Sequence, residues 1–194
     1  PLLFGIGDRA LLEGGGLTIV GSRNVDAQGA EFTRTAAGLC ARQGIRVVSG
    51  GARGVDSIAM ESALQSGGTV LAVLADSLLK KSLQKAERSA LAADTLLLLS
   101  PYHPESSFSV GAAMGRNKLI YALSDYALVV SADDRKGGTW AGAEEELKRE
   151  NPLYVFVRMT GDIPEGNRRL LSLGARAWPN AGPEDALHEL LAKA

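Results

Sequence analysis

The fold class of this chain is decided by one stretch, IRVVSGGARGVD at residues 45–56. A short apolar run, Ile45–Ser49, leads into a turn with three glycines, and a helical pattern follows from Val55 to Ser66. The run lacks alternating polar residues, which is typical of a strand buried on both faces. A strand, a glycine turn and a helix in this order form the repeating unit of a parallel α/β sheet.

The same alternation continues on both sides of this stretch. The apolar runs predict strands at Leu17–Val20, Ile45–Ser49, Val70–Ala75, Thr95–Leu99, Tyr126–Val130 and Leu153–Val157. The helical patterns lie at Ala27–Arg42, Val55–Ser66, Lys80–Ala92, Asn117–Leu123, Ala141–Glu150 and Pro183–Ala192. We therefore predict an α/β, Rossmann-like three-layer fold, a mostly parallel sheet with helices on both faces. Ligands bind such sheets outside the carboxyl ends of the strands, where the strand order reverses.

Length and composition favour one main domain. The chain has 194 residues, of which 45% are hydrophobic, so we expect a domain over residues 17–194 and a leading segment, residues 1–16, that packs on it. No apolar run approaches the roughly 20 residues that span a bilayer, and the first residues show no signal-peptide pattern. We therefore expect a cytoplasmic protein with no membrane partner.

Charge and residue types limit the chemistry that this chain can perform. Its 21 basic and 22 acidic residues nearly cancel, so a site for a polyanion must be local. Cys40 is the only cysteine, which excludes an internal disulfide and a multi-cysteine metal site. The sequence also lacks paired histidines, an acidic cluster and a Ser-His-Asp order. We expect no metal and no cofactor.

The strongest candidate for a binding loop is the glycine turn after the second predicted strand. Gly50, Gly51 and Gly54 let the backbone approach a ligand closely, and Arg53 adds a guanidinium that can bind phosphate through two N–H groups. The glycine spacing matches neither the dinucleotide fingerprint nor a Walker loop. Asp56 lies in the first turn of the next helix, where helix capping explains it without a ligand.

Two further turns are each followed by a predicted helix. After the first strand, Gly21, Ser22 and Arg23 bring N–H groups, a hydroxyl and a guanidinium to one strand end. A tight turn that satisfies its own backbone explains these residues equally well. After the fifth strand comes Gly137-Gly138-Thr139, where the threonine can donate to a phosphate. The alternative is a glycine-rich connection without a ligand.

A cationic cluster consists of Arg116, Asn117 and Lys118, which the pattern places at a helix start. Positive side chains at that end oppose the helix dipole, so they need either a bound anion or simple exposure to solvent. We favour the bound anion.

In this order, the turns resemble the motifs of the DNA-processing protein A (DprA/Smf) family. The matching stretches are Gly21-Ser22-Arg23, residues 49–56, Arg116-Asn117-Lys118-Leu119-Ile120 and Gly166-Asn167-Arg168-Arg169-Leu170-Leu171. The chain departs from the family pattern at Ala59-Met60, where an alanine-histidine pair is usual, and at Gly137-Gly138-Thr139, where serine-glycine-serine is usual.

The resemblance implies an extended Rossmann fold that binds single-stranded DNA and catalyses no reaction. It also implies a role in DNA uptake, transformation and recombination, in which the protein helps to load a RecA-type recombinase and pairs as a homodimer. Ser22, Arg23, Arg53 and Lys118 would face phosphates, and Asn117 would fix its loop. Such binding falls steeply with added salt. Candidates for stacking on bases are Tyr102, Phe108, Tyr121 and Trp140.

Two other functions remain open from the sequence. The chain partly resembles nucleoside-monophosphate phosphoribohydrolases of the lonely-guy type, in which Arg116 would hold the phosphate and Glu144 would steady the ribose and the departing base. An exposed helix with spaced opposite charges explains Glu144 without catalysis. The same crevice could instead sense a nucleotide.

Overall fold

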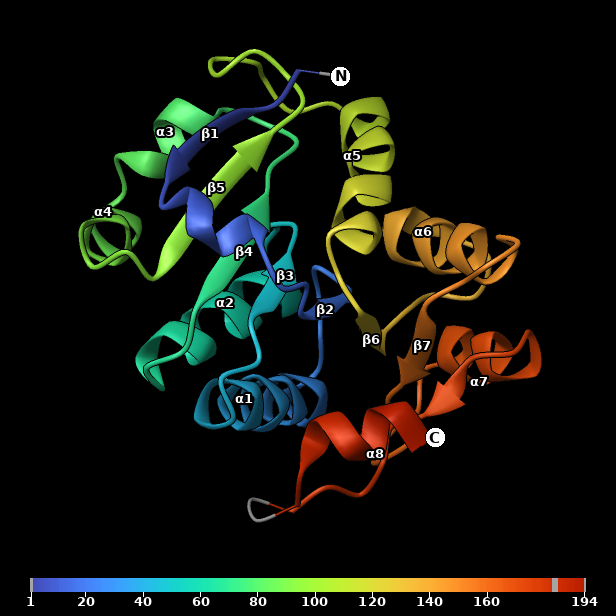
Figure 1. Ribbon diagram of the computed structural model, residues 1–194. Helices are drawn as coiled ribbons and strands as arrows, with labels where there is room; N and C mark the ends of the chain where they lie inside the picture. Colours follow the sequence, from blue (N-terminus) through green and yellow to red (C-terminus); the bar gives the residue numbers. More distant parts are fainter. Residues whose placement is uncertain (1, 183–184, 194) are drawn as a thin grey trace.

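The computed structural model describes residues 2–182 and 185–193, and these residues form one twisted sheet between two layers of helices (Figure 1). The strands are β1 (Phe4–Gly7), β2 (Leu17–Gly21), β3 (Val47–Ser49), β4 (Val70–Val73), β5 (Leu96–Ser100), β6 (Tyr126–Ser131), β7 (Tyr154–Val157) and β8 (Arg176–Ala177). Their order across the sheet is β1-β5-β4-β3-β2-β6-β7-β8. Only β1 runs antiparallel to its neighbour within this sheet. The predicted fold class is confirmed.

Helices cover both faces of the sheet. They are α1 (Ala27–Arg42), α2 (Val55–Gln65), α3 (Leu78–Ser82), α4 (Lys85–Ala92), α5 (Val110–Ala122), α6 (Gly137–Leu147), α7 (Glu165–Ser172) and α8 (Leu187–Lys193), and a 3-10 helix, η1, spans Arg9–Leu12. Strand residues alternate between two apolar clusters. Val47 belongs to a cluster that also contains residues of α1, α2 and α8, whereas Val48 belongs to the cluster on the other face, which contains residues of α5, α6 and α7. Burial on both faces explains why the strands lack polar residues.

The strand order reverses at β2. Its neighbours are β3, the next strand in the chain, and β6, which follows more than a hundred residues later. Val20 of β2 lies opposite Val129 of β6, and the register shifts by one residue so that Gly21 lies opposite Ser131. The turns that follow β2 and β6 therefore leave the same edge of the sheet side by side, at the position where such folds bind ligands.

Two predicted helix starts are wrong, and both errors affect the site. The helix expected from Asn117 begins at Val110, because the Ser109 hydroxyl accepts a hydrogen bond from Ala112 N and caps it (3.1 Å). The helix expected from Ala141 begins at Gly137. Arg116 and Lys118 thus lie in the middle of α5, and the expectation of an anion from the helix dipole does not hold.

Other boundaries also differ from the prediction. The helix expected at Lys80–Ala92 is two short helices, α3 and α4, and the Ser82 hydroxyl donates to Leu79 O (2.8 Å) where α3 ends. Of the helix expected at Pro183–Ala192, residues 183 and 184 lie outside the described residues, and α8 covers Leu187–Lys193. Among the described helices, none has both the length and the apolar composition needed to cross a bilayer.

Candidate functional site

The turns after β2 and β3 touch at a glycine. Gly54 has a positive φ of 84°, and a Cβ there would lie 2.7 Å from Arg23 O. Beside it, Val55 N donates to Ser22 O (3.2 Å). A Cβ on Gly21 would lie 2.6 Å from Val55 Cγ2. Because real Cβ atoms do not approach other atoms so closely, glycine at both positions lets the two turns pack as one surface.

Two adjacent clefts open on this surface. The first, of about 370 Å³, lies at the reversal point between the end of β2, the face of α5 and the start of α6. Predicted site residues in its lining are Gly21, Ser22, Arg23, Arg116, Asn117, Gly137, Gly138 and Thr139. The second, of about 420 Å³, lies beside the glycine turn. Predicted site residues in its lining are Arg23, Gly50, Gly51, Arg53 and Arg116.

Two exposed guanidinium groups, Arg23 and Arg53, line the second cleft. Arg23 lines both clefts, and its guanidinium carbon lies 4.7 Å from the centre of the Phe108 ring. Arg53 lines the second cleft and donates from Nη2 to Asn24 Oδ1 (3.5 Å). Both side chains are solvent-exposed, so they can reach an anion that runs along this edge. We call this pair, Arg23 and Arg53, the arginine rim.

Arg116 has a structural role. Its side chain is buried, and Nη1 donates to Gly50 O and to Val73 O, which ties α5 to the glycine turn and to β4. Burial lowers the pKa of this guanidinium from its ordinary value, and the nearby negative charge of Asp56 opposes that change. Because Nη1 is held by these two backbone carbonyls, Arg116 fixes the shape of the second cleft, whereas its buried Nε makes no hydrogen bond within the described residues.

Asp56 anchors the same turn from the other side. Its Oδ2 accepts hydrogen bonds from Gly50 N (3.1 Å) and Ala52 N (3.4 Å). Burial raises the pKa of the carboxyl to about 6, against the charge of Arg116 and the backbone N–H groups, which lower it. The sequence suggested helix capping for this residue, but α2 has no side-chain cap. Asp56 instead orders the glycine turn that precedes the helix.

The first turn of α6 supplies anion donors to the first cleft. Gly137, Gly138 and Thr139 line it, and no side chain caps the helix. The N–H groups of a first helical turn lack intrahelical partners, and the helix dipole favours negative charge there. Asn117 Nδ2 donates to Gly138 O (3.0 Å), so α5 holds this turn in place.

Lys118 and Glu144 lie outside both clefts. Lys118 Nζ is 3.0 Å from Glu145 Oε1 on α6, and both side chains are exposed. Glu144 pairs with Lys148 along α6 (3.0 Å), and the hydrogen bond from Lys148 lowers the pKa of this carboxyl. With Arg116 committed to backbone carbonyls as well, this geometry gives the phosphoribohydrolase alternative no support.

The four candidate stacking residues differ in accessibility. Phe108 is 46% exposed and lines both clefts, whereas Tyr121 and Trp140 are buried. Tyr102 donates its hydroxyl hydrogen to Ala112 O (2.9 Å). Of these four, Phe108 is therefore the aromatic ring that a base could reach. Among the described residues, no group of three or more His, Cys, Asp or Glu side chains could hold a metal ion.

Comparison with known proteins identifies relatives along nearly the whole chain. It is 29% identical to DNA processing protein DprA of Bacillus subtilis and 32% identical to protein Smf of Escherichia coli, in each case over 97% of this chain. The chain spans 64% of the first relative and 50% of the second.

Solved structures agree with these relatives. DprA from Streptococcus pneumoniae matches with a TM-score of 0.79 and 26% identity, covering 98% of this chain and 65% of that one. DNA processing protein A from Helicobacter pylori, for which a single-stranded DNA binding mode is described, matches with a TM-score of 0.77 and 28% identity, covering 98% and 87%. A molybdenum cofactor carrier protein from Chlamydomonas reinhardtii shares the fold alone, at 22% identity and a TM-score of 0.60.

The family model described as DNA recombination-mediator protein A matches residues 1–190. The chain therefore belongs to this family, that of the DprA and Smf proteins.

Proposed function

We propose that this chain binds single-stranded DNA and acts as a recombination mediator, with the phosphates of the strand held along the arginine rim. The observation that carries the proposal is the presence of two exposed guanidinium groups, Arg23 and Arg53, in the lining of the second cleft, of which Arg23 also lines the first. Charge-assisted hydrogen bonds from guanidinium to phosphate are among the strongest contacts available to a DNA-binding surface. A DNA strand that runs from the second cleft into the first would meet both arginines and the first turn of α6.

The charges on this surface should attract the phosphates of DNA only moderately. The formal net charge of the chain is −1, so attraction of a polyanion depends on this surface. Within the second cleft, Asp76 stands near the arginines and opposes a phosphate. Binding should therefore be moderate and strongly dependent on salt. With Phe108 as the accessible ring among the predicted stacking residues, it should also tolerate many sequences.

Several parts of the proposal rest on the family alone. They are the loading of a RecA-type recombinase, the pairing as a homodimer, the cytoplasmic place of action and the role in DNA uptake. The relative from Helicobacter pylori supports the choice of ligand. Arg23, Arg53, Ser22 and the first turn of α6 are the proposed DNA contacts, and Lys118 can join them where the strand passes beyond the first cleft.

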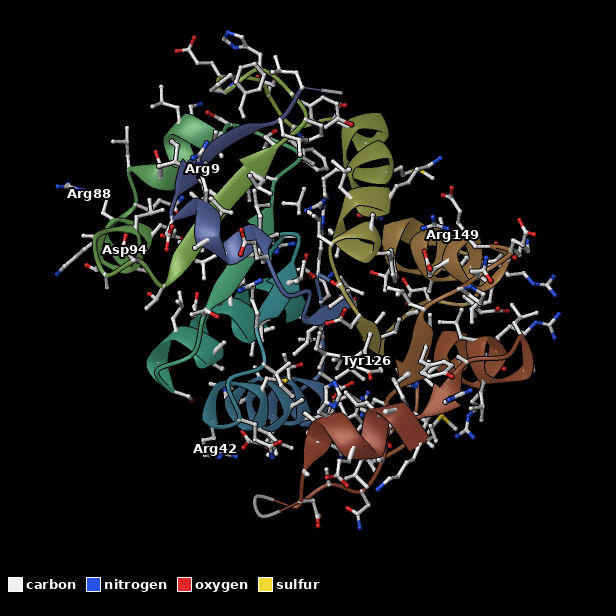
Figure 2. The ribbon with its side chains drawn as sticks, viewed as in Figure 1. Arg9, Arg42, Arg88, Asp94, Tyr126 and Arg149 are labelled. Carbon is white, nitrogen blue, oxygen red and sulfur yellow. The ribbon has the colours of Figure 1, made fainter. Side chains whose placement is uncertain are left out.

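Fluorescence anisotropy of a labelled oligo-dT strand tests this assignment. The wild-type protein should bind the strand, and Arg23→Ala or Arg53→Ala should each weaken binding about tenfold or more, because a hydrogen bond between charged groups is lost. Arg88→Ala is the matched control. This exposed arginine lies on α4, at the outer edge of the molecule and far from α5 and α6 (Figure 1, Figure 2). Wild-type affinity in both rim variants would contradict the proposal.

A further inference from the structure

Arg158 is a buried charged residue that lines neither cleft. It directly follows β7, and its side chain is 0% exposed. Its Nε donates to Val130 O (3.0 Å), its Nη1 to Thr160 O (2.8 Å) and its Nη2 to Asp162 O (3.1 Å). Its positive charge is paired with Asp26, whose Oδ2 lies 3.4 Å from Nη2. A charge removed from water destabilises the fold unless it is paired and hydrogen-bonded, and Arg158 is both.

Asp26 connects this buried charge to the turn that carries Arg23. It is the last residue before α1, and its Oδ1 accepts a hydrogen bond from Gly29 N (2.6 Å), which caps the helix. Its Oδ2 faces Arg158. At the other end of the turn, Ser22 O accepts a hydrogen bond from the first residue of α2 (3.2 Å). Arg23 therefore belongs to a turn, between β2 and α1, that is held at both ends.

Asn167 ties Arg158 to the lining of the first cleft. This side chain on α7 is fully buried, and its Nδ2 donates to Val130 O and to Arg158 O (both 3.0 Å). Its Oδ1 accepts from Ala132 N (3.0 Å), and Ala132 lines the first cleft where the chain leaves β6. A Cβ on the preceding Gly166 would overlap Ala132 O, so this close contact requires glycine. The motif that begins with Gly166 and Asn167 therefore fixes Arg158 relative to the cleft.

We propose that Arg158, acting through Asp26, positions Arg23 so that one DNA strand can contact both this arginine and the first turn of α6. The inference rests on the proposed function and names the residues that set its geometry. Because Arg158 also donates to the end of β6, it joins the turn after β2 to the strand that leads to α6. Hydrogen bonds to phosphate act only at short range, so the two turns must keep a fixed spacing. A turn that is held in advance does not have to be ordered when DNA binds, which favours binding.

A conservative variant of Asp26 tests this role. Asp26→Asn keeps a side-chain oxygen that can cap α1 and removes the charge that faces Arg158. The variant should bind oligo-dT about two- to tenfold more weakly in anisotropy titrations, which is the effect of having to order one long side chain on binding. Loss of a negative charge has by itself the opposite effect, because it favours binding of a polyanion. Weaker binding therefore indicates positioning.

A double-mutant cycle shows whether the effect passes through Arg23. In the Arg23→Ala background, Asp26→Asn should cause no further loss of affinity, because the side chain that Asp26 helps to position is absent. A purely structural role of the ion pair would lower the melting temperature and leave the affinity of the folded protein unchanged. Titrations well below the melting temperature of each variant separate the two roles.

Two further variants complete the test. Arg158→Met/Asp26→Asn removes both charges, so that no buried charge is left without a partner, and it should weaken binding by the same factor. Asp94→Asn is the matched control, because this exposed residue after α4 lies at the outer edge of the molecule (Figure 2) and should keep the wild-type affinity. Wild-type or tighter binding by both variants of the ion pair, or an equal loss with and without Arg23, would overturn the inference and leave the proposed function standing. Failure of the wild type to bind oligo-dT would overturn both.

Discussion

Replacing Gly50 by alanine should destabilise the protein, because the glycine turn has no room for a Cβ atom. A Cβ at this position would overlap the guanidinium of Arg116 and would lie 2.6 Å from Asp56 Oδ2. Neither neighbour can move freely. Arg116 donates to Gly50 O and Val73 O, and Asp56 accepts from Gly50 N and Ala52 N.

The expected loss follows from this crowding. Inserting a methyl group into a well-packed region costs about 1–3 kcal/mol, and two anchored neighbours put Gly50→Ala in the upper part, about 2–3 kcal/mol. For a chain of this size, each kcal/mol lowers the melting temperature by about 2–4 °C. The variant should therefore melt about 4–12 °C below the wild type. Its affinity for oligo-dT should also fall, since the turn shapes the second cleft.

Differential scanning calorimetry measures this change, and Gly111→Ala is the control. Gly111 is the second residue of α5, and a Cβ there would meet no atom within 4 Å. Alanine at a free helical position is favoured over glycine by about 0.5–1 kcal/mol, so this variant should melt slightly above the wild type. If Gly50→Ala melts at the wild-type temperature, Arg116 and Asp56 do not pack against Gly50 as described.

Three further predictions concern charged residues. The Asp56 carboxyl has its pKa raised from 3.8 to about 6 in the folded protein, so the stability it contributes is fully present below pH 3.8 and is lost as the pH rises through 6. The unfolding free energy of the wild type relative to Asp56→Asn should then fall by about 2–3 kcal/mol between pH 3.8 and 7 in urea titrations, and a constant difference would contradict the burial of this charge. Asp76→Asn should tighten binding of oligo-dT severalfold at low salt, because it removes a negative charge from the second cleft, and weaker binding would argue against a phosphate there. Lys118→Ala should weaken binding less than Arg23→Ala, because Glu145 already neutralises the lysine, and an equal loss would show that the strand continues over α5 and α6.

Apolar patterning predicted six of the eight strands that the described residues form in the sheet. All six predicted strands are present, because strands buried on both faces must be apolar throughout. The rule that ligands bind at the carboxyl ends of the strands, where the strand order reverses, predicted that the motifs would cluster there, but the position of the reversal at β2 came from the structure. The two-residue strand β8 and the edge strand β1 carried too little pattern to be recognised.

Apolar patterning did not predict where α5 and α6 begin. Val110 begins α5 and is followed by Gly111, Ala112 and Ala113, whereas Gly137 and Gly138 begin α6. Glycine disfavours a helix, and small side chains carry no apolar periodicity, so these first turns looked like loops. The error mattered because it placed Arg116 and Lys118 at a helix end that they do not occupy.

The direction in which each side chain points also could not be predicted from the sequence. Arg116 and Lys118 are two residues apart on α5, yet one is buried against Gly50 and Val73 while the other is exposed beside Glu145. A helix turns by about 200° over two residues, so such neighbours point to opposite sides. A cationic motif alone does not show which of its members can reach a ligand.

The salt dependence of DNA binding tests most directly whether Arg23 and Arg53 hold phosphates. For single strands, the slope of log K against log salt concentration changes by about 0.7 for each phosphate contact. The double variant Arg23→Ala/Arg53→Ala should therefore bind oligo-dT more weakly and with a slope about 1.4 shallower than the wild type, whereas Arg88→Ala should keep the wild-type slope. A double variant that keeps the wild-type slope would show that the strand lies elsewhere on the molecule.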